Sequence, residues 1–283
     1  MKLADDDIER FIDMALAEDV GRGDITTAAV VPEPARLAAD MHCRQDIVVA
    51  GIDIALGVFR RLAGECQTQV FTPDGARAAA GTTLAHIEGP ARALLSAERT
   101  ALNIVQNLSG IATLTRAFVD RIAGTGATLL DTRKTVPGMR LLAKYATSVG
   151  GARNHRMRLD DGVIIKDNHI AVCGGVGPAV AAAKAAGLRA IEIECDSLEQ
   201  VRDALEAGAD RLMLDNMDLE TLRGAVAMAR GRVPTEASGG VTLETVRRIA
   251  ETGVDFISVG RITHSAPAVD IGLDFSDPGG GAD

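Results

Sequence analysis

Two stretches of the chain repeat one unit, made of a helix, a glycine and a strand. LEQVRDALEAGADRLMLDN (198–216) and LETVRRIAETGVDFISVGR (243–261) are identical at seven of nineteen aligned positions. The glycine suits the left-handed residue that follows a helix, and the apolar run after it has a strand pattern. Repeated units of this size are typical of parallel strands joined by right-handed crossovers. The second half of the chain is therefore predicted to be a (β/α) barrel or an open wound sheet.

The strand candidates of this half end at polar or glycine positions that recur regularly. We expect six strands, at residues 127–131, 163–166, 190–194, 211–215, 233–238 and 256–260. Four of them end, at intervals of 21, 23 and 22 residues, at Glu194, Asp215, Ser238 and Gly260. Parallel strands gather their carboxyl ends on one rim, where barrel enzymes carry their chemistry. With Arg133 and Lys166 at two further strand ends, these positions predict one site on an incomplete barrel.

The first half has a different pattern. A helix is expected at residues 5–19, and short apolar runs between turn residues predict an antiparallel α+β arrangement. Its strands are expected within 35–49, 66–71 and 83–88, with a helix at 51–62. A long helix from Pro90 is expected to break at Ser109-Gly110 and to resume until about residue 123. We place the domain boundary at Gly110, which gives domains of residues 1–109 and 110–268. The glycine-rich end of the chain is expected to be disordered.

The amino-acid composition argues against a membrane-spanning or secreted protein. Hydrophobic residues make up 47% of the chain and aromatic residues 2%, so the core is built from aliphatic side chains. The chain lacks the roughly 18 uninterrupted apolar residues that a membrane span needs. The opening MKLADDDIERF is acidic and unlike a signal peptide, and the four cysteines form no CxxC pair. We expect reduced thiols, a cytoplasmic location and no membrane partner.

The stretch from Asp131 to His169 is basic, although the formal net charge of the chain is −9. It holds eight Lys or Arg against four Asp. A local cationic cluster on an acidic protein indicates a site for a small anion, whereas a nucleic-acid binder spreads its charge over a whole face. The cationic side chains that we expect to bind it are Arg133, Lys134, His155 and Arg156.

The remaining strand ends suggest phosphate and metal chemistry. Ser238-Gly239-Gly240 before a helix expected near Thr242, with Gly260 on the next strand, predicts a phosphate site. Lys166 has two interpretations, a phosphate ligand or a Schiff-base nucleophile. Glu194 and Asp215 could bind sugar hydroxyls or hydrated Mg²⁺, or act as general bases. His155, His169 and Cys173 lack zinc-ligand spacing, which argues against a zinc site.

Several motifs together resemble the quinolinate phosphoribosyltransferase family, also called nicotinate-nucleotide pyrophosphorylase (carboxylating). They are EDVGRGDITT, ERTALNIVQNLSGIATLT, DTRKTVPGMR, NHRMRLDDGVIIKDNHI, IEIECDSLEQV, MLDNM, EASGGV and VGRITHSAPAVDIGLD. The resemblance implies an N-terminal α/β sandwich, joined by the tail 269–283, and a C-terminal incomplete (β/α) barrel of six or seven parallel strands. It also implies a homodimer or higher oligomer with shared active sites.

The implied reaction converts quinolinate and 5-phosphoribosyl 1-pyrophosphate to nicotinate mononucleotide, pyrophosphate and CO₂, with Mg²⁺, in NAD biosynthesis. The resemblance assigns catalytic roles to Lys134, Lys166, Glu194 and Asp215. It places Mg²⁺ at Glu194 and Asp215, through water and the bound pyrophosphate substrate. The full set of substrate-binding residues that it implies is Arg99 (from the neighbouring subunit), Thr132, Arg133, Lys134, His155, Arg156, Lys166, Glu194, Asp215, Ser238, Gly239, Gly260 and His264.

Three other functions remain as alternatives. A paralogue associated with molybdenum transport operons shares this fold, but the complete DTRKT, NHR and VGRITHS motifs favour the quinolinate enzyme. A lyase would use Lys166 as a Schiff-base nucleophile. A nucleic-acid-binding protein would use the basic stretch, but the negative net charge and the scarcity of aromatic residues oppose it.

Overall fold

The computed structural model describes residues 1–276, and the chain divides into two compact units. The first comprises Met1–Leu114, Leu141–Gly150 and the segment from Ala266 onward, and the second comprises Thr115–Arg140 and Gly151–Ser265. The predicted disorder of the glycine-rich end falls on residues 277–283, outside the described residues. Within residues 1–276, no helix is both long and apolar enough to cross a membrane.

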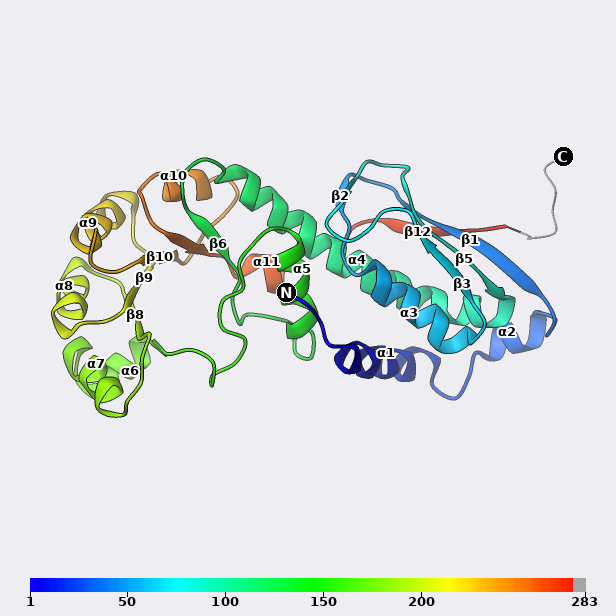
Figure 1. Cartoon of the computed structure of the whole chain (residues 1–283), viewed down its shortest axis with the longest axis horizontal. Helices are drawn as coiled ribbons and strands as arrows, with labels where there is room; N and C mark the ends of the chain where they lie inside the picture. The colour runs from blue at the N-terminus through cyan, green and yellow to red at the C-terminus, as the bar shows by residue number, and fades with distance from the viewer. Residues whose placement is uncertain (277–283) are drawn as a thin grey trace. The chain divides into compact units, whose positions relative to one another are not determined.

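The first unit contains a four-stranded antiparallel sheet in the order β12-β1-β5-β3 (Figure 1). Its strands are β1 (Arg36–Cys43), β3 (Gln67–Val70), β5 (Thr83–Pro90) and β12 (Ile271–Ser276). The two-residue strands β2 (Ile47–Val48) and β4 (Arg77–Ala78) form a separate pair. Because β12 pairs with β1, the end of the described chain belongs to this sheet. This is the antiparallel mixed architecture that the sequence predicts.

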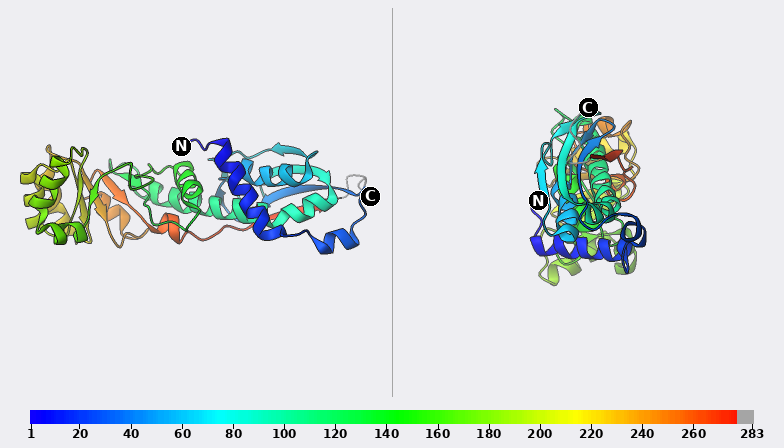
Figure 2. Two further views of the ribbon diagram at one scale, coloured as in Figure 1. Left: turned by 90° about the horizontal axis from the view of Figure 1, so that it is seen from below. Right: turned by 90° about the vertical axis from the view of Figure 1, so that its right-hand side faces the viewer.

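Helices complete the first unit. They are α1 (Asp5–Val20), α2 (Ile25–Val30), α3 (Ile52–Ala63), most of α4 (Ala91–Arg121) and most of α5 (Arg140–Val149). α1 packs against α3, where Gly57 leaves room for the Ile12 side chain (Figure 2). Asp74 accepts hydrogen bonds from Gly51 N at 2.7 Å and from the Tyr145 hydroxyl at 2.6 Å, which ties α5 to the start of α3.

Helix α4 corrects one expectation, because it runs for 31 residues without the break predicted at Ser109-Gly110. Glycine is unfavourable inside a helix, so its presence needs another cause. A Cβ atom on Gly110 would lie 2.1 Å from the carbonyl oxygen of Pro267. Glycine is required here by the close approach of the returning chain, and it does not end the helix.

The second unit is an incomplete barrel, as predicted. All six strands are parallel, in the order β6-β11-β10-β9-β8-β7. Their bounds are β6 (Thr128–Leu130), β7 (Ile164–Ile165), β8 (Glu192–Cys195), β9 (Arg211–Asp215), β10 (Thr235–Ser238) and β11 (Phe256–Ser258). A single parallel bridge between Leu130 and Arg153 extends the sheet beyond β6.

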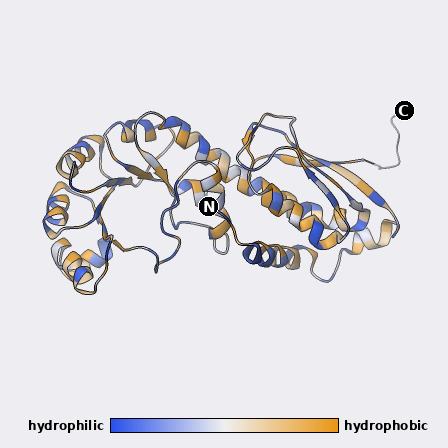
Figure 3. Ribbon diagram, viewed as in Figure 1, coloured by the Kyte–Doolittle hydropathy of each residue, from blue (hydrophilic) through white to orange (hydrophobic). Residues whose placement is uncertain are grey.

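Helices alternate with these strands and cover the outside of the sheet (Figure 1). They are α6 (Asp167–Cys173), α7 (Val176–Ala185), α8 (Leu198–Ala207), α9 (Leu219–Ala229), α10 (Val246–Ala250) and α11 (Arg261–His264). The helices α8 and α9 are amphipathic, and Figure 3 shows hydrophobic and hydrophilic colours side by side along them. In α8, Val201, Ala204 and Leu205 form the buried face, and the cap residue Ser197 accepts a hydrogen bond from Gln200 N.

The requirement for glycine at position 110 predicts a large loss of stability on substitution. We expect Gly110→Ala to lower the free energy of unfolding by about 2–4 kcal/mol, because the new methyl group overlaps the Pro267 carbonyl. Gly224→Ala, inside α9, is the control, because a Cβ there would lie at an ordinary contact distance of 3.4 Å from the Leu198 methyl groups. It should leave stability unchanged or raise it by up to about 1 kcal/mol in the same denaturant titration. Equal effects of the two substitutions would contradict this explanation.

Candidate active site

The carboxyl ends of the six parallel strands surround a cavity of about 540 Å³. It lies within the second unit and is lined by residues from the loops that follow the strands. The structure brings together nine of the predicted site residues in its lining: Thr132, Arg133, Lys134, His155, Arg156, Lys166, Glu194, Asp215 and Ser238. Residues that are up to 106 positions apart in the sequence thus face one space, because the strand ends converge.

Alternation along the strands determines which side chains enter the barrel. Successive strand residues point to opposite faces, so residues two apart share a face. Glu192 and Glu194 therefore point inward together on β8, as do Arg211 and Asp215 on β9. The residues at the carboxyl ends reach the cavity, and those two or four positions earlier lie deeper in the barrel.

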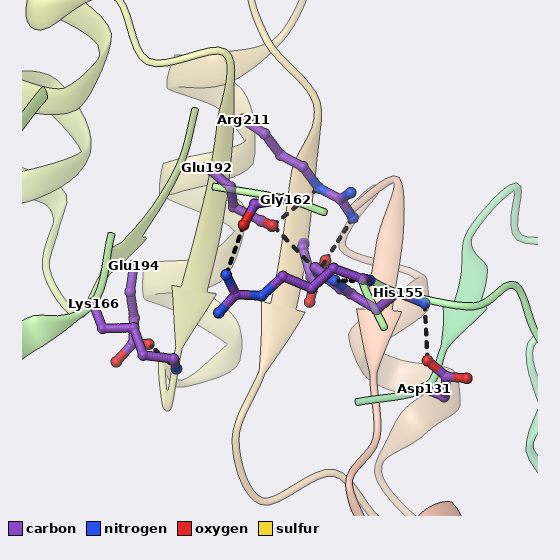
Figure 4. A network of polar contacts seen from close by, with 9 residues as sticks. Asp131, His155, Gly162, Lys166, Glu192, Glu194 and Arg211 are labelled. Atoms are coloured by element: carbon purple, nitrogen blue, oxygen red, sulfur yellow. Dashed lines mark hydrogen bonds and ion pairs between the residues drawn. The ribbon is translucent and has the colours of Figure 1, made fainter. Parts of the chain in front are cut away.

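Lys166 and Glu194 form an ion pair at the cavity, with 2.9 Å between Nζ and Oε2. Figure 4 shows this pair apart from the other polar network of the barrel. The backbone N–H of Lys166 also donates to His169 Nδ1 at 2.8 Å, which fixes the start of α6. An ammonium paired with a carboxylate is suited to binding phosphate oxygens, whereas Schiff-base chemistry needs the free amine.

The loop that follows β9 packs against the glycines that follow β10. Asn216 Nδ2 donates to Asp215 Oδ2 at 2.5 Å, and a Cβ on Gly239 would lie 2.1 Å from Asn216 Oδ1. Gly239 also has a φ of +90°, so only glycine fits there without strain. The prediction that a helix starts near Thr242, directly after this loop, was wrong. Helix α10 begins at Val246, and Thr242 lies before it.

The DTRKT loop is attached to the last short helix of the barrel. Thr263 Oγ1 donates to the Lys134 carbonyl at 2.6 Å, and Lys134 N donates to Thr132 Oγ1 at 3.0 Å. A Cβ on Gly260 would lie 3.0 Å from Lys134 Cδ and 3.4 Å from the His264 ring. Gly260 and His264 are thus neighbours of Lys134, although neither contributes to the cavity lining.

Asp131 links the two basic motifs of the site. Its side chain is completely buried, and it accepts hydrogen bonds from His155 N at 2.8 Å and from Asn154 Nδ2 at 2.6 Å. The strand that carries Arg133 is thereby fastened to the loop that carries Arg156. The Nε atoms of both arginines are buried and have no hydrogen-bond partner within residues 1–276. Two such donors at a cavity can be satisfied by an anionic ligand.

Arg156 is held by its own loop. One guanidinium nitrogen donates to the Gly162 carbonyl at 2.7 Å, as Figure 4 shows. Burial lowers the pKa of Arg156, and the nearby positive charge of Arg133 lowers it further. Two guanidinium groups that repel each other favour a ligand with negative charge between them.

Four charged residues occupy the barrel interior beneath the cavity, and we call them the buried quartet: His155, Glu192, Arg211 and Glu236. Arg211 pairs with both carboxylates, at 3.1 Å to Glu192 and 2.5 Å to Glu236. His155 Nε2 lies 3.2 Å from Glu192 and 3.5 Å from Glu236 (Figure 4). The two carboxylate side chains are only 5% and 0% exposed.

The quartet sets the state of the His155 ring. Burial opposes its positive charge, but hydrogen bonds and charge from Glu192 and Glu236 outweigh burial and raise the pKa of His155 to about 9. The backbone N–H of Arg156 donates to Nδ1 at 2.7 Å, which places the proton of the neutral ring on Nε2, facing the carboxylates. Burial raises the pKa of Glu192, whereas His155 and Arg211 hold the pKa of Glu236 below its ordinary value.

Two groups of acidic residues could hold a metal ion. Glu194 and Asp215 end neighbouring strands at the cavity and offer only oxygen ligands, which Mg²⁺ prefers. The donor atoms of His155, Glu192 and Glu236 lie within 4.8 Å of one another, but Arg211 already pairs with both of these carboxylates. The sequence interpretation missed this second group.

Sequence interpretation therefore missed Glu192, Arg211, Glu236 and the connecting role of Asp131. A signal was available, because each missed carboxylate of the quartet stands two residues before a residue that we assigned to the site. The interpretation also counted Lys144 in the basic stretch. Lys144 is completely buried in α5, which belongs to the first unit, so it is not part of this cavity. Arg99 lies exposed on α4 in the first unit.

Comparison with known proteins gives matches along most of the chain. Residues 24–109 match the family described as quinolinate phosphoribosyl transferase, N-terminal domain. Residues 111–274 match the family described as quinolinate phosphoribosyl transferase, C-terminal domain. The two matches together include all the predicted site residues.

Individual relatives are similar to this chain over nearly its full length. The nicotinate-nucleotide pyrophosphorylase (carboxylating) of Mycobacterium leprae is 45% identical over 92% of this chain and 94% of its own. The probable enzyme of the same name from Bacillus subtilis is 41% identical over 94% of this chain and 93% of its own. The solved structure of the nicotinate-nucleotide pyrophosphorylase from Francisella tularensis has a TM-score of 0.92 at 39% identity, covering 97% of this chain and 98% of that one.

The state of His155 predicts a pH dependence of stability. Its folded pKa of about 9 lies above the ordinary value of 6.5, so its stabilising contribution is complete below about pH 6.5 and is lost as the pH rises through 9. We expect the unfolding free energy to fall by on the order of 2 kcal/mol between those values. Denaturant titrations of the native protein and of His155→Asn would measure this. A slope that persists unchanged in His155→Asn would contradict the prediction.

Proposed function

This chain belongs to the quinolinate phosphoribosyltransferase family, and we propose that it converts quinolinate and 5-phosphoribosyl 1-pyrophosphate into nicotinate mononucleotide, pyrophosphate and CO₂. This reaction is a step of de novo NAD biosynthesis. The observation that carries the proposal is the cavity at the strand ends, where cationic side chains from separate motifs converge on a protein of net charge −9. Such a cavity suits two substrates that are both strongly anionic.

The dicarboxylate half of the site is formed by Arg133, Lys134, His155 and Arg156. Arginine pairs with a carboxylate through two parallel hydrogen bonds, and both arginines here have a buried Nε without a partner among the described residues. Thr132 lies in the same loop and supports it through its hydrogen bond from Lys134 N. The two arginines bind the adjacent carboxylates of the pyridine ring and fix the ring nitrogen relative to the sugar.

The ribosyl pyrophosphate half is formed by the later strands. Lys166 pairs with pyrophosphate oxygens, and Glu194 and Asp215 face the ribose hydroxyls and the metal. Ser238 and Gly239 bind the 5′-phosphate, with Gly260 and His264 beside them. The left-handed conformation of Gly239 and Gly240, at φ of +90° and +60°, turns the loop back at the strand end, where βα loops of barrels bind phosphate.

Mg²⁺ is the proposed metal. Glu194 and Asp215 fit it, because both carboxylates line the cavity and Mg²⁺ takes one or two carboxylates together with water and substrate phosphates. When bound, the ion neutralises the charge of the pyrophosphate. The chain itself has other tasks: it orients the two substrates, and it surrounds the leaving groups with fixed cations.

The chemistry follows from this arrangement. The pyridine nitrogen attacks the anomeric carbon while the bond to pyrophosphate breaks, and the transition state has oxocarbenium character. Positioning and charge stabilisation are the main contributions of the enzyme, and no covalent nucleophile is required. Loss of the 2-carboxylate as CO₂ leaves an electron pair on the ring carbon next to the positive nitrogen, and Lys134, Arg133 and Arg156 stabilise that charge. The carbon then takes up a proton from water to give nicotinate mononucleotide.

We further propose a homodimer with shared active sites in the cytoplasm. Arg99 is exposed on α4, so it is free to enter the site of a second subunit and pair with a quinolinate carboxylate. The four cysteines, none of which is in a disulfide, support a reducing compartment.

A direct assay tests the activity. The purified protein with quinolinate, 5-phosphoribosyl 1-pyrophosphate and Mg²⁺ should produce nicotinate mononucleotide and CO₂ in equal amounts. Nicotinate, which lacks the 2-carboxylate, should be a poor substrate because it leaves one arginine unpaired. Absence of product at millimolar substrate would refute the proposal. A borohydride-trapped adduct on Lys166 would instead support the Schiff-base alternative.

Subunit mixing tests the shared site. Arg99→Ala and Lys134→Ala should each reduce activity by about 100-fold or more while leaving the fold intact, because each removes a cation that contacts substrate. Exchange of subunits between the two variants creates one site without either substitution. We expect about a quarter of native activity in the mixture, from random pairing of equal amounts. No recovery despite demonstrated subunit exchange would contradict the shared site.

A further inference from the structure

A gain in stability does not explain why the charged side chains of the buried quartet fill the barrel interior. A barrel interior is usually filled by branched apolar side chains. Here His155, Glu192, Arg211 and Glu236 fill it instead, and the two carboxylate side chains are at most 5% exposed. Replacement of buried ion pairs by apolar side chains of similar volume is often neutral or stabilising. A buried charged group of this kind therefore calls for a role other than stability.

We propose, on the basis of the proposed function, that Glu192 and Glu236 are positioning residues that hold the His155–Arg156 segment in the orientation that binds the dicarboxylate substrate. The two carboxylates hold His155 Nε2 from inside the barrel, at 3.2 and 3.5 Å. On the other side of the ring, Arg156 N donates to Nδ1 at 2.7 Å. The imidazole is thus fixed at both nitrogens, and its position fixes the backbone of Arg156.

The other attachments of this segment act in the same direction. Asp131 holds His155 N from the end of β6, and Gly162 accepts from the Arg156 guanidinium. The quartet adds the contact to β8, β9 and β10, which lie between the edge strands β6 and β7 of the sheet. The contacts with Asp131 and Gly162 tie the segment only to residues beside the two edge strands, after β6 and before β7 respectively, among the contacts named here.

The quartet also forms the inner boundary of the substrate cavity. His155 and Glu236 line that cavity, whereas Glu192 and Arg211 line a second cavity of about 670 Å³ at the amino-terminal ends of the strands. His155 and Arg156 line both. The ion pairs thus lie between the two spaces, directly behind the residues that bind the substrate.

Charge balance favours a proton over a metal ion at His155. Glu192 and Glu236 carry two negative charges, and Arg211 supplies one positive charge through contacts of 3.1 and 2.5 Å. The Nε2 proton of His155 faces the same two carboxylates, while Nδ1 accepts from Arg156 N. A divalent ion bound to the same donors would leave an excess positive charge in a buried site, which is costly.

The test compares Glu236→Gln and Glu192→Gln with Glu199→Gln, an exposed residue in the first turn of α8. Each quartet variant should raise KM for quinolinate by about tenfold, because an ion pair with His155 in the barrel interior is lost. KM for 5-phosphoribosyl 1-pyrophosphate should stay within about twofold, since the phosphate side of the site is unchanged. Glu199→Gln should match the native protein in both constants. Glu236→Asp, which keeps the charge, should recover part of the quinolinate affinity.

Two further measurements separate positioning from general damage. In protein with ¹⁵N-labelled histidine, the His155 ring resonances should shift in Glu236→Gln and stay unchanged in Glu199→Gln. If single variants fold poorly, the double variant Glu236→Gln with Arg211→Met keeps the net charge of the quartet unchanged and should show the same selective rise in quinolinate KM.

The outcomes distinguish the inference from the function on which it rests. A native protein that makes no product refutes the proposed function. An active native protein whose quartet variants keep quinolinate KM within about twofold, or whose two KM values rise equally, refutes the inference. One equivalent of tightly bound zinc or manganese in the native protein, lost in Glu236→Gln, would also overturn it, in favour of a metal site.

Discussion

The carboxylate of Asp131 is the contact on which the site depends. It stands at the end of β6, is fully buried, and accepts hydrogen bonds from the backbone and side chain of the Asn154–His155 segment. The two basic motifs are separated along the chain by α5, which belongs to the other unit. Asp131 brings them together again at the edge of the barrel. A buried carboxylate without these donors would be strongly unfavourable, so the fold and the site require the same hydrogen bonds.

The residues at the rim of the barrel were predictable from the sequence. The charged residues in its interior were not predicted. Apolar runs that stop at regular intervals indicated six parallel strands and the convergence of Glu194, Asp215 and Ser238, because strand ends meet by topology alone. Finding the quartet from the sequence required a further step. Side chains two residues apart on a strand share a face, so each strand end had to be followed back into the barrel in steps of two residues. A Glu within a strand pattern reads as a solvent-facing position unless its partners are known, and Arg211 lies 25 residues from Glu236.

Other misses have a similar cause. Gly110 has the local signature of a helix break, but a contact with Pro267, from a distant part of the chain, explains it. Thr242 stands where a helix start was expected, but α10 starts at Val246, and no contact named here explains the delay. Asp218 and Ser197, by contrast, have residue types that favour helix caps, and each caps the helix that follows it. Local chemistry is readable from sequence, whereas long-range contacts override it.

The Lys166–Glu194 pair connects this electrostatic arrangement to the proposed reaction. In this structure the two side chains neutralise each other at 2.9 Å, with Lys166 partly exposed to the cavity. A pyrophosphate with its Mg²⁺ carries the same two kinds of charge, an anion for Lys166 and a cation for Glu194. Binding would therefore exchange one ion pair for two, and neither charged group would be left unpaired in the occupied cavity. This exchange avoids the desolvation penalty that a lone buried charge would incur. It also requires both residues at neighbouring strand ends, which the parallel order of β7 and β8 supplies.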